Sequence, residues 1–146
     1  MRRAIYEHAR AAFPAECCGY LVSERDRPDH GHRVIRCTNA QASGMNPAAP
    51  DRSKETGFVI AGTELFAFAK SFDGPSPARV VYHSHTNGRA YFSEVDRAVA
   101  IAAGRPTYPV EHLVVGLTAG GVTEAAQFAW SDEAGEFVEV ARWKPD

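Results

Sequence analysis

The chain has 146 residues, of which 45% are hydrophobic and 23% are charged, and its formal net charge is −2. This size and balance fit one soluble globular domain with a single core. The 16 Lys and Arg residues form no basic stripe, which argues against a nucleic-acid-binding protein. No apolar run approaches the ~20 residues that span a membrane, so no membrane segment is expected.

The first residues and the cysteines bear on the compartment. Residues 1–10 carry charges throughout and lack the apolar stretch of a secretory signal peptide, so none is predicted. Three cysteines, with Cys17 and Cys18 adjacent, are an odd number and form no disulfide framework. We therefore expect a cytoplasmic protein. The sequence leaves its oligomeric state open.

The first part of the chain predicts a helix, a hairpin and a long loop. Apolar residues at helical spacing run through residues 2–12, until Pro14 stops the pattern. The runs at 17–23 and 33–38 are typical of two strands joined by a turn. Residues 39–57 are rich in Asn, Ser, Gly and Pro and predict a long loop, a kind of segment that is often functional.

The middle of the chain predicts alternating strands and helices. A short strand is expected at residues 58–60. Thr63 is expected to cap a helix that ends near residue 72. A β-rich run at 79–85 predicts a strand, and an Ala-rich helix is expected from Ser93 to near Gly104.

The last part predicts three strands, at residues 110–117, 122–130 and 136–143, joined by Gly-containing turns. Strands and helices are mixed, and hairpins are expected at both ends of the chain. The predicted fold class is therefore α/β or α+β, with a mixed sheet around one core and a single domain over residues 1–146.

The most informative segment is His83-Ser84-His85, which is followed after seven residues by Ser93 and then Asp96. Residues i and i+2 of a strand point to the same face, so His83 and His85 present two imidazoles side by side. Asp96, in the first turn of the next helix, can fold back beside them. Two His and one carboxylate are a catalytic zinc set that leaves a fourth position for water.

Amide hydrolysis also needs a group that moves a proton, and a carboxylate with a tuned pKa suits this role. Glu16 is the candidate for this general acid/base, because it is a charged residue directly before an apolar strand. Ser93 could donate a hydrogen bond to the oxyanion that forms on the attacked carbonyl. Ser93 and Asp96 also fit a helix capping box, and the two roles are compatible.

These residues resemble a known signature. His83-Ser84-His85, seven residues, Ser93 and Asp96 look like the JAMM (MPN+) motif, and residues 14–19, Pro-Ala-Glu-Cys-Cys-Gly, resemble the segment that carries the catalytic Glu of that family. The resemblance implies the JAB1/MPN fold, which is similar to that of cytidine deaminases, and one Zn²⁺ per chain. It also implies peptidase or isopeptidase chemistry next to the C-terminal glycine of a ubiquitin-like protein.

The chain departs from the eukaryotic form of this motif at two positions. Thr86 and Phe92 stand where proline is usual. Thr86 and the pair Ala90-Tyr91 are instead similar to bacterial members of the CysO-cysteine hydrolase type, which act on ubiquitin-like sulfur-carrier proteins ending in Gly-Gly. Such a carrier is the expected partner. Asn39 and the 43–57 loop, with Met45 and Phe58, could form a groove for its extended tail.

Two other classes of function remain open. The chain could be a non-catalytic MPN scaffold that binds protein partners, although scaffolds of this family typically lose ligands and all of them are present here. It could also be a cysteine-dependent hydrolase with Cys17 or Cys18 as the nucleophile. Free cysteines at the start of a strand are more often buried small hydrophobes.

Overall fold

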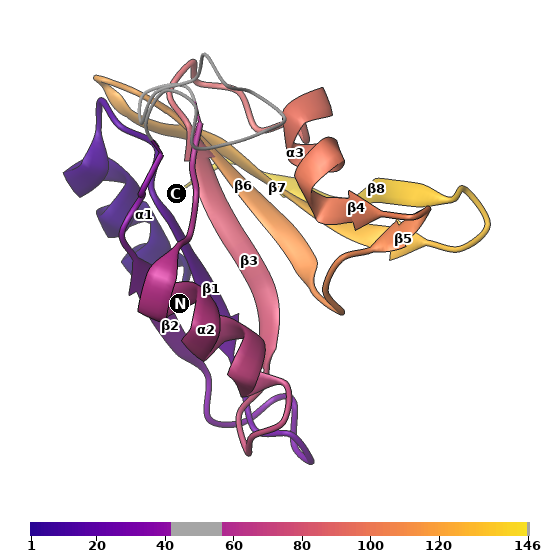
Figure 1. Ribbon diagram of the computed structural model, residues 1–146. Coiled ribbons are helices and arrows are strands. Elements are labelled where there is room, and N and C mark those ends of the chain that lie inside the picture. Colours follow the sequence, from indigo (N-terminus) through magenta and orange to yellow (C-terminus); the bar gives the residue numbers. More distant parts are fainter. Residues whose placement is uncertain (42–56, 146) are drawn as a thin grey trace.

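The computed structural model describes residues 1–41 and 57–145, which form one mixed sheet with helices on both of its faces (Figure 1). Its larger elements are, in chain order, α1 (Arg2–Ala12), β1 (Cys18–Val22), β2 (Arg33–Cys37), α2 (Gly62–Ser71), β3 (Ala78–His85), α3 (Glu94–Ala100), β6 (Glu111–Thr118), β7 (Gly121–Ser131) and β8 (Glu136–Trp143). Two short strands, β4 (Ile101–Ala102) and β5 (Arg105–Pro106), pair with each other. Among the described residues, no helix is long and apolar enough to cross a membrane.

The six-stranded sheet has the order β2-β1-β3-β6-β7-β8. All neighbouring strands are antiparallel except β3 and β6, which run parallel with His83 opposite Val114 and His85 opposite Gly116. A parallel pair needs a crossover, and here it contains α3. This arrangement confirms the predicted α+β class with a mixed sheet. It also places the carboxyl ends of β3 and β6 together, a position where open sheets containing parallel strands often bind ligands.

Helix α1 covers one face of the sheet. Ile5, Tyr6 and Ala9 lie on the same side of this helix and are buried. They pack with Leu21 of β1 and Tyr82 of β3 in one apolar cluster. Burial of this stripe fixes α1 on the sheet, so the segment that leaves it enters β1 at the same edge as the end of β3.

Helices α2 and α3 lie over the opposite face (Figure 1). Phe68 of α2 packs in a cluster with Val81 of β3, and Ala100 at the end of α3 packs in a separate cluster against β6, β7 and β8. Strand side chains alternate between the two faces. His83 therefore shares the face of Val81, beneath α2 and α3, whereas Tyr82 points to α1.

Helix α2 begins earlier than the sequence predicts. Thr63 as its N-cap is wrong, because Ala61 occupies that position and no side chain caps the helix. Glu64 in the first turn accepts a hydrogen bond from the backbone N–H of Thr38 at 2.9 Å. This hydrogen bond connects the start of the helix to the end of β2. Together with the favourable negative charge near the helix N-terminus, it takes the place of a hydroxyl cap.

The strand expected at residues 58–60 is not formed. The carbonyl of Val59 accepts a hydrogen bond from Ala40 at 2.8 Å, but the N–H of Val59 donates to the side chain of Asn39. The side chain thus replaces a backbone partner, and no ladder extends from this point.

Helix α3 ends at Ala100 rather than near Gly104. Ala103 and Gly104 both have positive φ, 53° and 74°, and form the turn of the β4–β5 hairpin. Ile101 packs against the apolar cluster beneath α3. Alanine favours helix, but this hairpin and the burial of Ile101 outweigh that local preference.

Candidate metal centre

Strand β3 and helix α3 bring together three residues that the sequence singled out. His83 and His85 point to the same face of β3, and their Nε2 atoms lie 3.1 Å apart. The Oδ2 atom of Asp96 lies 3.2 Å from His83 Nε2 and 3.3 Å from His85 Nε2. Both rings are buried. The three atoms therefore form a small triangle shielded from bulk water.

Asp96 is held in this position by the start of α3. Ser93 and Asp96 form a capping box, in which Ser93 Oγ accepts a hydrogen bond from the N–H of Asp96 at 3.1 Å and Asp96 Oδ2 accepts one from the N–H of Ser93 at 2.9 Å. The same carboxylate oxygen that faces the two histidines thus also takes part in the cap. Capping and ligand positioning coexist in one geometry.

The hydrogen bond made by Nδ1 of His85 determines whether its Nε2 carries a hydrogen or a free lone pair. His85 Nδ1 lies 3.3 Å from the carbonyl oxygen of Arg89. A carbonyl can only accept, so Nδ1 carries the hydrogen and Nε2 of the neutral ring presents a lone pair. That lone pair faces Asp96 Oδ2, which is another acceptor, at 3.3 Å. Two lone pairs that face each other repel, and a cation bound between them would remove this repulsion.

The protonation states of His85 and Asp96 suit metal binding, whereas the pKa of His83 is shifted in the opposite direction. Burial would raise the pKa of Asp96, but His83 and His85 hold it well below its usual range, so the carboxylate stays ionised. Burial lowers the pKa of His85, which keeps this ring neutral. Burial also lowers the pKa of His83, but the Asp96 carboxylate raises it by more, and the net shift is upward. Metal ligands must be deprotonated, and His85 and Asp96 already are.

The donor set and its size fit zinc. Zinc takes imidazole nitrogen and carboxylate oxygen at about 2.0–2.2 Å, and in a tetrahedron such ligand atoms lie about 3.3–3.5 Å apart. The three sides of the triangle measure 3.1, 3.2 and 3.3 Å. Three protein ligands leave a fourth tetrahedral position. His83 Nδ1 is buried and has no hydrogen-bond partner in the described part of the chain.

Glu16 reaches the same place from the segment that enters β1. Its side chain is buried, and its carboxylate and one nitrogen of each histidine lie within 4.8 Å of one another. Glu16, His83 and His85 could by themselves hold a metal. Asp96, however, lies closer than this limit to both histidines. Asp96 thus offers a second carboxylate, with its Oδ2 within 3.3 Å of both imidazole nitrogens.

Two polar side chains hold the backbone around Glu16, a role that the sequence pattern does not reveal. Ser84 Oγ accepts a hydrogen bond from the N–H of Cys17 at 2.7 Å. Asn39 Nδ2 donates to the carbonyl of Glu16 and to that of Gly57, each at 2.9 Å. The serine between the two histidines of β3 is a small polar residue in the strand, and this is the sequence signal for the first contact. The second depends on the folding of distant segments.

Aromatic rings cover the histidines. Phe58 stacks on His83, with ring centroids 4.5 Å apart and planes inclined by 22°. Tyr91 lies on His85 at 4.6 Å. Each imidazole therefore has an aromatic ring packed against it.

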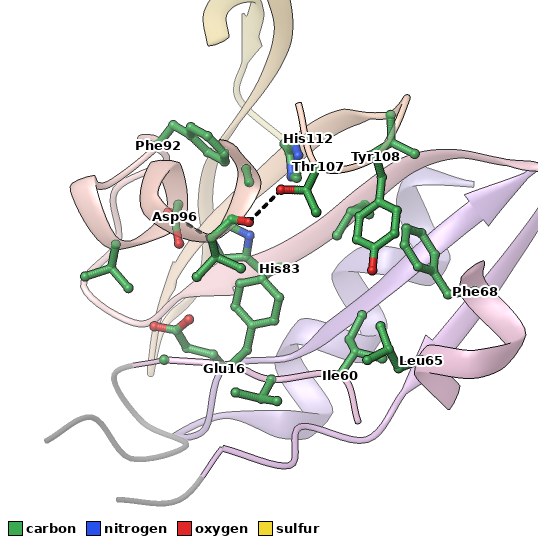
Figure 2. A pocket seen from close by; sticks show the side chains of 18 of the residues that line it. Glu16, Ile60, Leu65, Phe68, His83, Phe92, Asp96, Thr107, Tyr108 and His112 are labelled. Atoms are coloured by element: carbon green, nitrogen blue, oxygen red, sulfur yellow. Dashed lines mark hydrogen bonds and ion pairs between the residues drawn. The ribbon is translucent and has the colours of Figure 1, made fainter. Parts of the chain in front are cut away.

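A cavity of about 340 Å³ opens from the metal centre. Figure 2 shows Glu16 and Asp96 on one side of His83, while Leu65, Phe68 and Tyr108 gather on the other. The polar groups are thus concentrated at one end and the rest of the described wall is mostly apolar. Ser93 is not among the described residues that line this cavity.

His112 also lines the cavity but adds no positive charge to it at neutral pH. Its ring lies 5.0 Å from that of Phe92 and 4.9 Å from that of Phe137. Burial lowers the pKa of His112 to about 4. This packing against two aromatic rings gives His112 a structural role.

The cysteines are buried and free. Burial raises the pKa of Cys17 to about 11 and that of Cys37 to about 12, and it raises the pKa of Cys18 as well. The nucleophilic form of cysteine is the thiolate, which is scarce at such pKa values. The burial and the raised pKa values of these thiols therefore do not favour a cysteine-dependent hydrolase. Of the groove expected for a substrate tail, Met45 and most of the 43–57 loop lie outside the described residues.

The comparison with protein families gives the class of protein. The family described as prokaryotic homologs of the JAB domain matches residues 1–132. The chain belongs to this family, as the motif around His83 and Asp96 predicts. The mixed sheet is accordingly that of a JAB domain.

Among curated relatives, the chain is similar to proteins named CysO-cysteine peptidase from Mycobacterium tuberculosis and Mycobacterium bovis, with 32% identity over 114 residues. The match covers 77% of this chain but only 65% of the length of those relatives. Two solution structures share the fold. A protein from Desulfitobacterium hafniense has a TM-score of 0.62 at 23% identity, covering 95% of this chain and 84% of that one. One from Salinibacter ruber has a TM-score of 0.55 at 22% identity, covering 99% and 87%.

Proposed function

We propose that this chain is a zinc-dependent peptidase that hydrolyses the bond after the C-terminal Gly-Gly of a small ubiquitin-like sulfur-carrier protein. The observation that carries the metal part is the triangle of His83 Nε2, His85 Nε2 and Asp96 Oδ2, whose sides of 3.1 to 3.3 Å suit one tetrahedral zinc ion. The similarity to proteins named CysO-cysteine peptidase supports the carrier as substrate.

Each residue has a role in this proposal. His83, His85 and Asp96 would hold the metal. When bound, zinc would lower the pKa of a coordinated water and polarise the attacked carbonyl. Glu16 accepts a proton from the attacking water and returns it to the nitrogen of the departing amine. Glu16 is buried and lines the cavity, so its carboxylate lies beside the space that the reacting groups would occupy.

Ser93 is proposed to donate a hydrogen bond to the oxyanion. Its Oγ accepts the N–H of Asp96 in the capping box, and accepting leaves the hydroxyl hydrogen for another partner. Leu65, Phe68 and Tyr108 give the rest of the cavity an apolar wall. Low polarity around the reacting carbonyl strengthens the electrostatic effect of each donor. The three buried, free cysteines are consistent with a reducing compartment, and we infer a cytoplasmic location from them.

The test combines metal content with cleavage. Wild type, His83→Ala and Glu16→Gln would be assayed for zinc by mass spectrometry. Each would then be incubated with a sulfur-carrier protein whose Gly-Gly end bears an added cysteine. We expect one zinc per wild-type chain, none in His83→Ala, and zinc without cleavage in Glu16→Gln. Cleavage that persists in Glu16→Gln, or after zinc is chelated, would contradict the mechanism. Zinc with no wild-type cleavage would contradict the substrate alone.

A further inference from the structure

The loop of residues 86–92 joins the two parts of the metal centre. It leaves β3 directly after His85 and ends at Ser93, where α3 and its Asp96 begin. Its conformation therefore sets where His85 and Asp96 lie relative to each other. What holds this loop is then part of what builds the site.

One ion pair binds both polar groups of a residue in this loop. Glu124 Oε2 on β7 accepts the N–H of Ala90 at 2.8 Å. Arg142 Nη2 on β8 donates to the carbonyl of Ala90 at 2.7 Å. Glu124 and Arg142 are themselves 2.8 Å apart, and Glu139 orients the same guanidinium at 2.7 Å. Ala90 is only 1% exposed, so its peptide groups depend on these partners rather than on water.

A second anchor lies two residues earlier in the loop. The N–H of Gly88 donates to the carbonyl of Leu117 at 3.0 Å, and the hydroxyl of Thr123 donates to the carbonyl of Gly88. Arg89 is thus held between two fixed residues. The carbonyl of Arg89 is the group that accepts from His85 Nδ1 at 3.3 Å.

We propose that Glu124 and Arg142 are positioning residues for the metal centre, which fix the Ala90 peptide and, through the carbonyl of Arg89, the ring of His85. A fixed carbonyl partner selects the tautomer with hydrogen on Nδ1 and aims Nε2 at the metal position. The proposal rests on the metal centre of the proposed function. It concerns neither the substrate nor the hydrolytic step.

An exposed ion pair without contacts to the loop should not affect zinc binding when it is removed. Glu124 and Arg142 have side chains that are 26% and 39% exposed, and exposed ion pairs contribute little to stability. The pair Arg27 and Glu24 lies at 2.7 Å and is also exposed, but it is remote from the loop. Glu24→Gln is therefore a matched control, because it removes a comparable ion pair that contacts neither Ala90 nor Arg89.

The experiment measures zinc affinity by competition with a chromogenic chelator in wild type, Glu124→Ala, Arg142→Ala and Glu24→Gln. Removing a partner that orients a metal ligand typically weakens binding 10–100-fold, and for this more remote pair we expect about tenfold. Glu24→Gln should match wild type. Glu124→Gln keeps an oxygen that can accept from Ala90 and should restore part of the affinity. It also serves as the test variant if an alanine variant fails to fold.

Two readouts on the metal-free protein separate this proposal from the proposed function. Hydrogen–deuterium exchange at the Ala90 amide should be slow in wild type and Glu24→Gln but fast in Glu124→Ala. Nitrogen NMR of His85 should show hydrogen on Nδ1 in wild type and a loss of that preference in the two alanine variants. Wild-type exchange, tautomer and zinc affinity in both alanine variants would overturn the proposal. If the wild type binds no zinc, the proposed function fails, and the exchange and tautomer results still decide this one.

Discussion

The hydroxyl oxygen of Ser84 accepts a hydrogen bond from the backbone N–H of Cys17 at 2.7 Å. This contact links the residue between the two histidines to the residue that follows Glu16. The N–H of Ser84 also donates to the carbonyl of Cys17 at 3.1 Å. Ser84 points away from the metal face of β3, yet it sets how far the Glu16 backbone lies from that face.

Ser84→Ala should therefore lower kcat while zinc affinity stays near wild type, because the ligands themselves are unchanged. The buried N–H of Cys17 loses its partner, which should cost about 1–3 kcal/mol of unfolding free energy. Both effects can be measured by steady-state kinetics and urea unfolding. Ser23→Ala is a matched control. Ser23 is fully buried and accepts from Arg79 at 3.0 Å, so it should lose stability but keep kcat.

The two roles of Ser93 can be separated by comparing Ser93→Ala with Ser93→Gly. At an N-cap, alanine costs about 1 kcal/mol relative to serine, whereas glycine costs only a few tenths. Both variants lack the hydroxyl proposed to bind the oxyanion, whose loss should lower kcat about 100-fold or more. We expect equal losses of kcat but a larger loss of stability in Ser93→Ala than in Ser93→Gly. Normal kcat in Ser93→Gly would leave capping as the role of this residue.

The approach of His83, His85 and Asp96 to one another can be predicted from sequence because its geometry is local. Two histidines at i and i+2 of a strand must share a face. The capping box with Ser93 fixes the side chain of Asp96 at the start of the helix. Glu16 is less local, since 66 residues separate it from His83. The family resemblance, and not local spacing, connects the two positions.

The contacts that hold the loop of residues 86–92 could not be predicted from local spacing. Thr86 and Phe92 replace prolines of the related motif, so the sequence alone left open what stiffens the loop between them. The structure shows contacts from Glu124 and Arg142, which come from strands far along the chain. Such contacts depend on sheet register. The early end of α3 likewise follows from the pairing of Ile101–Ala102 with Arg105–Pro106, which local helix preference cannot anticipate.

His112 should make the fold sensitive to acid. Burial lowers its pKa from the ordinary value of 6.5 to about 4. Between these values the unfolded chain binds a proton that the folded chain does not, so stability falls as pH falls. The contribution is at most about 3 kcal/mol. His112→Phe keeps the packing against Phe92 and Phe137, and it should lose less stability than wild type between neutral pH and pH about 4 in urea unfolding. Equal losses in both proteins would contradict this.

Gly116 of β6 lies directly beneath the loop of residues 86–92. A Cβ at this position would come within 2.7 Å of the backbone of Gly88 and Arg89, which cannot yield as a flexible side chain can. Gly116→Ala should therefore push the loop outward and move the carbonyl of Arg89 away from His85. We expect weaker zinc binding, by about tenfold, although no ligand and no charged residue has changed.

Gly120→Ala is the matched control for this prediction, since a Cβ there would meet only the Thr118 hydroxyl, at 3.6 Å. Chelator competition should give wild-type affinity for Gly120→Ala and reduced affinity for Gly116→Ala. If Gly116→Ala binds zinc as tightly as wild type, the position of the Arg89 carbonyl does not govern the His85 ring. The tilted contact with the Tyr91 ring, whose centroid lies 4.6 Å from that of His85, would then hold the ring, and Tyr91→Ala would be the variant that loses affinity.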